Sequence, residues 1–438
     1  MFSTYLSLLH EFIAFRSIST DEAYKDDINA CADRLITLFT KYHFQTTKIS
    51  GYGNPLIVAH YEVDPSYQTI LIYGHYDVQP AHQDDGWQSD PFSLDERDGK
   101  LYARGSADNK WQFMIHIATV LDLIEQQRLA YNITFFIEWD EETGQPSSQA
   151  LLDHRELLHA DVALLSDGVI IGDHTPTMMV GLRGGGNATV TIQTATTDLH
   201  SGLYGNIATS ASHIASNLVA QLYDDKDHIT IPWWYDDIDH ISDIQKMNNA
   251  LVPRDDEEMM HTIGAVALAI PQGYDPVTAN GLLPTIQVTG ISSGYTGVGY
   301  KNIIPWSAMI NVNFRFAPGQ DPEKKMADFD AWITNTLPTN ISHQIIISDY
   351  YPAITISIDH PLSDRAKQIL KDVYAVSPIM RYCGATLPMA GILQNVLWLP
   401  VMVIDLANED CNIHGVDENI SLTCIEKGLR FSERLLGM

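Results

Sequence analysis

The sequence is poor in cysteine and has no long apolar run. Its four cysteines, Cys31, Cys383, Cys411 and Cys424, are scattered and form no CxxC pair. This pattern argues against a disulfide framework and favours reduced thiols in a cytoplasmic protein. No stretch approaches the roughly 20 apolar residues that a membrane-spanning helix needs. We therefore expect a cytoplasmic protein that does not cross a membrane.

Basic residues are also scarce. The chain has 26 Lys and Arg against 55 Asp and Glu, which gives a formal net charge of −29. Such a charge repels nucleic acid and anionic membrane surfaces, so we expect neither as a partner. The apolar start MFSTYLSLLHEFIAF lacks the basic region of a signal peptide, and Leu6, Leu9, Phe12 and Ile13 recur at helical spacing. We expect an amphipathic first helix there.

The order of apolar segments predicts an α/β protein with a second domain inserted into the first. With 438 residues, two domains are expected. Short strand-like runs such as TILIYGH, ITFFIEW and VALLSDG alternate with helical segments, which indicates a mostly parallel central sheet flanked by helices.

The pattern changes after Gly184–Gly186, a run that we interpret as a hinge. The segments that follow have the order β-α-β-β-α-β, and the α/β pattern resumes after Pro352. We therefore predict a catalytic domain of residues 1–185 and 353–438, interrupted by an inserted domain of residues 186–352.

Acidic and imidazole side chains follow several of the predicted strands. Ligands bind in α/β sheets at the carboxyl ends of the strands, so side chains placed there can form one site. The residues concerned are His75, Asp77, Asp108, Glu141, Glu142, Asp167 and His414.

Two imidazoles and several carboxylates suit two zinc-type ions, and histidine argues against calcium, which prefers oxygen ligands. Two neighbouring ions need a bridging ligand, which a carboxylate can provide, so we expect an aspartate between them. Asp77 lies two residues beyond His75 and could hold its ring. Of the adjacent Glu141 and Glu142, one could bind metal while the other acts as general base. Each residue alone could equally be a cap, a turn or a solvated charge.

The motifs GHYDVQP, ARGSADNK, EWDEETG, LLSDG, DLHSGLYG, RFAPGQDP and NIHGVDENI occur in this order. Together they resemble the M20 metallopeptidases, and in particular the carnosinase-like dipeptidases. The resemblance runs from the first predicted helix to the last. It implies a two-zinc hydrolase with a catalytic domain and an inserted lid or dimerisation domain, and hence a homodimer formed through that domain.

The resemblance also implies roles for the residues at the predicted sheet edge. Asp108 would bridge two zinc ions, with Mn²⁺ or Co²⁺ as alternatives, and the peptide bond after it would be cis. His75 and Asp167 would complete one metal site, and Glu142 and His414 the other. Glu141 would be the general base, and Asp77 would orient His75.

Four further residues acquire roles from the resemblance. His200, in the inserted domain, would stabilise the oxyanion in the active site of a partner subunit. Arg315, together with the loop of Gly384 and Thr386, would bind the carboxylate of the substrate. Two departures from the family pattern, Trp111 after DNK and Cys383 before Gly384, leave the metal ligands intact but put substrate preference in doubt.

We therefore expect a metallohydrolase that cleaves dipeptides or small peptides. One alternative is an N-acyl amino acid deacylase, such as a deacetylase or desuccinylase, on the same scaffold. Another is a metal-binding protein without catalytic activity.

Overall fold

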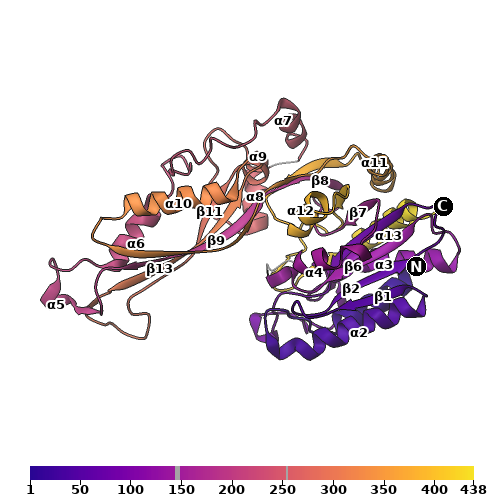
Figure 1. Cartoon of the computed structure of the whole chain (residues 1–438), viewed down its shortest axis with the longest axis horizontal. Helices are drawn as coiled ribbons and strands as arrows, with labels where there is room; N and C mark the ends of the chain where they lie inside the picture. The colour runs from indigo at the N-terminus through magenta and orange to yellow at the C-terminus, as the bar shows by residue number, and fades with distance from the viewer. Residues whose placement is uncertain (144–147, 253–254) are drawn as a thin grey trace. The chain divides into compact units, whose positions relative to one another are not determined.

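The computed structural model describes residues 1–143, 148–252 and 255–438, and its contacts divide the chain into two compact units (Figure 1). Unit 1 consists of Met1–Val180, Ile356–Arg381 and Pro388–Met438. Unit 2 consists of Gly181–Thr355 and Tyr382–Leu387. The predicted insertion, residues 186–352, lies within unit 2, and the short segment 382–387 also belongs to that unit.

Unit 1 contains most of a mixed sheet with the strand order β1-β2-β6-β3-β7-β17-β8-β15, in which β16 pairs with β8; the edge strand β15 belongs to unit 2. The four strands β6, β3, β7 and β17 are mutually parallel, whereas β1, β2, β8 and β15 are antiparallel to their neighbours. The strands are β1 (Gln45–Ile49), β2 (Leu56–Tyr61), β3 (Thr69–His75), β6 (Asn132–Glu138), β7 (Val162–Leu165), β8 (Thr177–Leu182), β15 (Ile354–Thr355), β16 (Ile379–Cys383) and β17 (Val401–Ile404).

Helices flank this sheet, so the predicted α/β class is confirmed. They are α1 (Phe2–Ile13), α2 (Lys25–Lys41), α3 (Lys110–Glu125), α4 (Ser148–Asp153), α11 (Pro361–Tyr374), α12 (Pro388–Asn395) and α13 (Leu422–Leu436). A small second sheet pairs β18 (Asn419–Ser421), β5 (Lys100–Tyr102) and β4 (Asp95–Arg97). Within the described residues, no helix is long and apolar enough to cross a membrane.

The central strands of unit 1 are buried on both faces. Strand β3 has a continuous buried run from Ile70 to His75, and all seven residues of β6 are buried. Such runs are typical of central parallel strands that are covered on both faces. Helix α3 packs against β3, and α1 and α13 pack against α3. This core fixes the direction and the end point of β3.

Unit 2 contains a four-stranded antiparallel sheet with the order β11-β13-β9-β14. Helices α6 and α10 pack against the sheet (Figure 1). They enclose a core around Trp234, Phe314 and Phe329. The strands are β9 (Gly184–Gln193), β10 (Leu199–His200), β11 (Thr285–Ser293), β12 (Ile303–Ile304), β13 (Ser307–Phe316) and β14 (Ser342–Tyr351). The helices are α5 (Ser201–Tyr204), α6 (Ala211–Ala220), α7 (Asp243–Asn249), α8 (Asp256–Ile263), α9 (Pro276–Leu282) and α10 (Pro322–Thr336).

The order β9-α6-β11-β13-α10-β14 matches the predicted β-α-β-β-α-β pattern. The run Gly184–Gly186, predicted to be a hinge, lies just past the boundary between the units at Val180 and Gly181, where the glycines begin strand β9 and are buried. A side chain on Gly184 would lie 2.4 Å from the main-chain oxygen of Tyr351 in β14. The lack of a side chain on these glycines therefore allows β9 to lie close to the end of β14.

Candidate active site

The candidate site is assembled in unit 1 from segments that follow neighbouring parallel strands. His75 is the last residue of β3, and Glu141 and Glu142 lie in the 3₁₀ turn that follows β6. Asp167 follows β7, which pairs with β3 on the side opposite β6. Because parallel strands share one carboxyl edge, side chains from three separate segments meet there.

Asp108 occupies the centre of this group. Its Oδ1 lies 3.0 Å from Nε2 of His75, and its Oδ2 lies 2.9 Å from Nε2 of His414. Asp108 directly precedes Asn109, the residue before helix α3, and the Asp108–Asn109 peptide bond is cis, as the resemblance implied. The two oxygens of one carboxylate thus face two different imidazoles.

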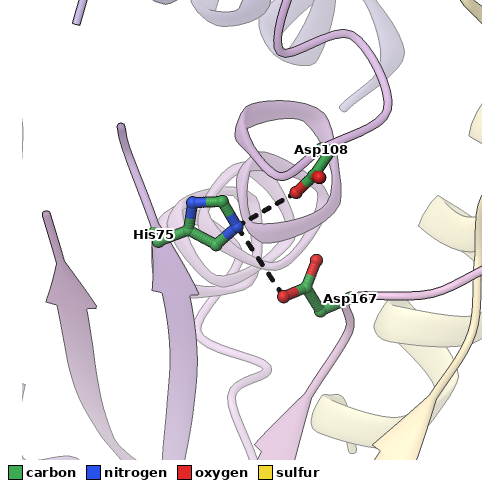
Figure 2. Close-up of side chains that lie close together, drawn as sticks. All are labelled: His75, Asp108 and Asp167. Atoms are coloured by element: carbon green, nitrogen blue, oxygen red, sulfur yellow. Dashed lines mark hydrogen bonds and ion pairs between the residues drawn. The ribbon is translucent and has the colours of Figure 1, made fainter. Parts of the chain in front are cut away.

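Two clusters of potential metal ligands share this aspartate. His75, Asp108 and Asp167 form the first, and Asp108, Glu142 and His414 form the second; the ligand atoms within each cluster lie within 4.8 Å of one another. Figure 2 shows the first cluster, in which Nε2 of His75 faces both carboxylates, with 3.7 Å to Oδ2 of Asp167. In the second, Nε2 of His414 lies 3.2 Å from Oε2 of Glu142.

The donors in these clusters fit a pair of zinc-type cations. Each cluster offers one imidazole nitrogen and two carboxylates, which are ligand types that zinc accepts, and three protein ligands are the number found in catalytic zinc sites. The shared Asp108 provides the bridge that two adjacent cations require. The residues brought together here are the five that the resemblance assigned to the metals.

Asp77 lies behind His75 and is fully buried. Nδ1 of His75 is 3.3 Å from Oδ1 of Asp77 and 3.2 Å from its main-chain oxygen. Oδ2 of Asp77 accepts hydrogen bonds from the Ser19 hydroxyl (2.7 Å) and from the main-chain N–H of Glu142 (3.1 Å). Asp77 is therefore placed to fix the imidazole ring of His75 and the start of the turn that carries Glu142.

The concentration of carboxylates perturbs the ionisation of the site. Burial raises the pKa of Asp167 to about 7; the charge of His75 opposes this effect and that of Asp108 adds to it. Burial also raises the pKa of Glu142, and so does the charge of Asp108. Hydrogen bonds to Asp108 and Glu142 raise the pKa of His414 to about 10. The metal-free site therefore retains protons that a bound cation would displace.

The pKa values of Asp108 and Glu141 are shifted in opposite directions. Burial alone would raise the pKa of Asp108, but hydrogen bonds from His414 and His75 outweigh it and hold the pKa below its usual value. The pKa of Glu141 is raised well above its usual value by burial; His75 opposes this effect, and Asp167 and Asp108 add to it. The carboxylate at the centre thus stays ionised, whereas Glu141 has the greater proton affinity expected of a general base.

Residues that sequence reasoning did not single out support the predicted ligands. Nδ2 of Asn109 donates to Oδ1 of Asp167 (2.7 Å), and the side chain of Gln79 donates to Oε2 of Glu142 (2.7 Å). Asn109 lies in the motif ARGSADNK and Gln79 in the motif GHYDVQP, and both motifs carry the resemblance. Their place in these motifs was the sequence signal that could have indicated them.

The residues predicted to bind the substrate carboxylate lie in unit 2. Nη1 of Arg315, in β13, donates to the hydroxyl of Thr386 (2.9 Å). The buried Arg183 donates from Nε to the main-chain oxygen of Gly384 (3.0 Å), and Gly384 N–H donates to the side chain of Asn280 (3.1 Å). Burial, with the nearby charge of Arg315, lowers the pKa of Arg183 to about 10. Two guanidinium groups close together favour an anion.

His200 lies at the end of the short strand β10 in unit 2. Its Nδ1 accepts a hydrogen bond from the main-chain N–H of Gly202 (3.1 Å), and the residue is exposed. His200 therefore lies in unit 2, whereas both ligand clusters lie in unit 1. Its predicted role in a partner's site stays a prediction.

Comparison with known proteins defines the class. The family model of peptidase family M20/M25/M40 matches residues 71–437. The chain belongs to this family, so the prediction of an M20-type metallopeptidase, a hydrolase of peptide bonds, is confirmed.

Two named relatives and one solved structure are similar to this chain over most of its length. The chain is 30% identical over 376 residues to the Beta-Ala-His dipeptidase of Mus musculus, covering 84% of this chain and 76% of the relative. It is 24% identical to the Cys-Gly metallodipeptidase dug1 of Schizosaccharomyces pombe, covering 97% and 93%. The crystal structure of human carnosine dipeptidase 1 has the same fold, with a TM-score of 0.87, 23% identity and coverage of 99% and 95%.

Proposed function

We propose that this chain is a two-metal dipeptidase. The observation that carries the proposal is the position of Asp108, whose two carboxylate oxygens each face a different histidine and belong to two ligand clusters. The substrate class is supported by relatives whose names are those of dipeptidases. The compartment is expected to be the cytoplasm.

His75, Asp108 and Asp167 would hold one cation, and Asp108, Glu142 and His414 the other. When bound, two such cations, expected to be Zn²⁺ with Mn²⁺ or Co²⁺ as alternatives, supply a Lewis acid that acidifies water and polarises the scissile carbonyl. Asp77 would keep His75 in one tautomer through Nδ1, which leaves Nε2 free to act as a ligand.

Glu141 would carry the proton through the reaction. It accepts a proton from water as the water oxygen attacks the scissile carbonyl carbon, and it delivers that proton to the amine nitrogen as the C–N bond breaks. Glu141 belongs to neither ligand cluster, so its carboxylate would remain free to accept and release this proton.

The residues of unit 2 would bind and polarise the substrate. Arg315 and Thr386, with the loop of Gly384, would bind the terminal carboxylate, for which a guanidinium offers two parallel hydrogen bonds. His200 would donate a hydrogen bond to the developing oxyanion in a partner subunit, which requires a homodimer formed through unit 2.

A substrate panel tests the proposal. The purified protein would be assayed against dipeptides and against N-acetyl and N-succinyl amino acids, before and after treatment with a chelator and re-addition of Zn²⁺. We expect chelator-sensitive hydrolysis of dipeptides. Hydrolysis of the N-acyl amino acids alone would establish a deacylase, and a protein that binds metal but hydrolyses neither would be a non-catalytic metal-binding protein.

A further inference from the structure

A buried ion pair lies directly behind the shared aspartate and joins two ligand-bearing segments of unit 1. Nη1 of Arg104 lies 2.6 Å from Oε2 of Glu418. Arg104 is 3% exposed and Glu418 is fully buried. The hydrogen bonds of both side chains go to each other and to main-chain groups, so the pair acts on the backbone around the site.

Glu418 holds the backbone that leads to Asp108. Its Oε1 accepts hydrogen bonds from the main-chain N–H groups of Ala107 (2.7 Å) and Asp108 (2.9 Å), and its Oε2 accepts one from Gly105 (3.1 Å). Charge-assisted hydrogen bonds of this kind are among the stronger ones in a protein interior. The shared aspartate is thus anchored through its own amide.

Arg104 holds the segment that carries His414. Its Nη2 lies 3.2 Å from the main-chain oxygens of both His414 and Gly415, and 3.4 Å from that of Pro80. Because His414, Asn412 and Asp417 all have a positive φ, between 56° and 62°, this segment has a backbone that non-glycine residues rarely adopt.

The two clusters differ in how firmly their histidines are fixed. The side chain of His75 is fully buried at the end of β3 and backed by Asp77, whereas the side chain of His414 is 52% exposed. Packing and Asp77 therefore position His75, while His414 depends on the backbone beneath it. Arg104 is the side chain that binds the carbonyl of His414 itself.

We propose that Arg104 and Glu418 are positioning residues that set the affinity of the His414-containing metal site, by holding the His414 segment against the Asp108 segment. The inference rests on the proposed two-metal function. It assigns a separate task to each partner: Arg104 acts on the His414 site alone, and Glu418 acts on both sites because both use Asp108.

A merely structural ion pair would act differently. Replacing a buried pair changes global stability, which would weaken both metal sites together or neither. Positioning instead predicts that one site weakens selectively, and only in a protein that retains His414. This readout separates positioning from stability.

The test is a Zn²⁺ titration in competition with a chromophoric chelator, on the full-length wild type and Arg104→Lys. Lysine keeps the charge opposite Glu418 but cannot reach all the carbonyls that the guanidinium fork binds. We expect the affinity of one site to fall about 10- to 100-fold, the range found for outer partners of metal ligands, while the other site is unchanged. In a His414→Ala background, Arg104→Lys should cause no further loss.

Glu418→Gln changes the other partner. Whichever way its amide points, its NH₂ group meets N–H donors, so we expect both sites to weaken; the selective readout that separates positioning from stability is therefore that of Arg104→Lys. Arg34→Lys is the matched control, because Arg34 forms a partly buried pair with Glu11, at 2.5 Å, in the same unit; it should leave both affinities unchanged.

Unchanged affinity in Arg104→Lys, equal loss at both sites in that variant, or a further loss in the His414→Ala background would overturn the inference. A wild type that binds fewer than two Zn²⁺ ions would instead overturn the proposed function, so the two failures are distinguishable.

Discussion

At the scale of single residues, the chemistry depends on carboxylates kept close together against their mutual repulsion. Burial raises the pKa values of Glu141, Glu142 and Asp167. Asp108, which accepts hydrogen bonds from two imidazoles, instead has a pKa below its usual value. In the metal-free site, retained protons relieve the repulsion between the carboxylates. The charge of divalent cations offsets the same repulsion, so a site of this kind favours them.

Glu141→Gln tests the assignment of the general base. Glutamine has the size of glutamate but cannot accept the proton, so kcat should fall by about 10²- to 10⁴-fold. Zinc content, measured by atomic absorption, should stay at the wild-type level because Glu141 belongs to neither ligand cluster.

Glu142→Gln is the adjacent control and should lose zinc as well as activity. Wild-type turnover in Glu141→Gln, or loss of its zinc, would remove Glu141 from the role of base.

Asp405 gives a pH-dependent prediction. Burial raises its pKa to about 7, although Arg381 and a hydrogen bond from Thr177 oppose this effect. A carboxyl group whose pKa is higher in the folded than in the unfolded state stabilises the fold at low pH, and this contribution is lost as pH rises from about 4 to about 7. Asp405→Asn should therefore stabilise the metal-free protein at pH 8 by a few kcal/mol, at about 1.4 kcal/mol per pKa unit.

The measurement is thermal unfolding of metal-free wild type and Asp405→Asn at pH 4 and pH 8. The gain should be present at pH 8 and nearly absent at pH 4. An equal effect at both pH values would show that Asp405 does not titrate in this range.

At the scale of elements, strand ends were the most predictable feature. The apolar runs before His75 and Asp167 show where β3 and β7 end, and these ends bring the two side chains together. Contacts between distant segments carry no such signal: Arg104 and Glu418 lie 314 positions apart. Glycine is found both in flexible turns and where chains pack closely, so the run Gly184–Gly186 did not by itself indicate its close approach to Tyr351.

Gly74→Ala tests the contact between β3 and α3. A Cβ on Gly74 would lie 2.4 Å from the Cβ of Phe113, a contact that neither element can relieve without moving. We expect a loss of about 1–3 kcal/mol in the free energy of unfolding, measured in urea, from overpacking.

Gly428→Ala in α13 is the matched control. The nearest atom, Cδ1 of Ile115, would lie at an ordinary 3.4 Å, and alanine favours a helix. It should be neutral or stabilising; an equal loss in both variants would contradict the account of Gly74.

At the scale of the whole molecule, the proposed dimer calls for an exposed surface on unit 2. β14 is an edge strand of the four-stranded sheet, and its Ile346, Ile347 and Tyr350 are 56%, 39% and 41% exposed. An apolar edge strand is suited to pairing with another chain, and a lysine on such a strand blocks pairing.

Ile346→Lys should therefore convert a dimer to a monomer in light scattering coupled to size-exclusion chromatography. Val266→Lys, at a fully exposed apolar position elsewhere in unit 2, is the control and should leave the dimer intact. A wild type that is monomeric at all concentrations, or a dimer that survives Ile346→Lys, would exclude this surface.

The central claim is that one aspartate joins two metal ions, and metal content tests it most directly. Wild type, His75→Ala, His414→Ala and Asp108→Ala would be dialysed against buffered Zn²⁺ and analysed by mass spectrometry of the intact protein under native conditions. The account predicts two ions per chain in the wild type, one in each histidine variant and none in Asp108→Ala. Two ions retained without Asp108, or a single ion in the wild type, would contradict it.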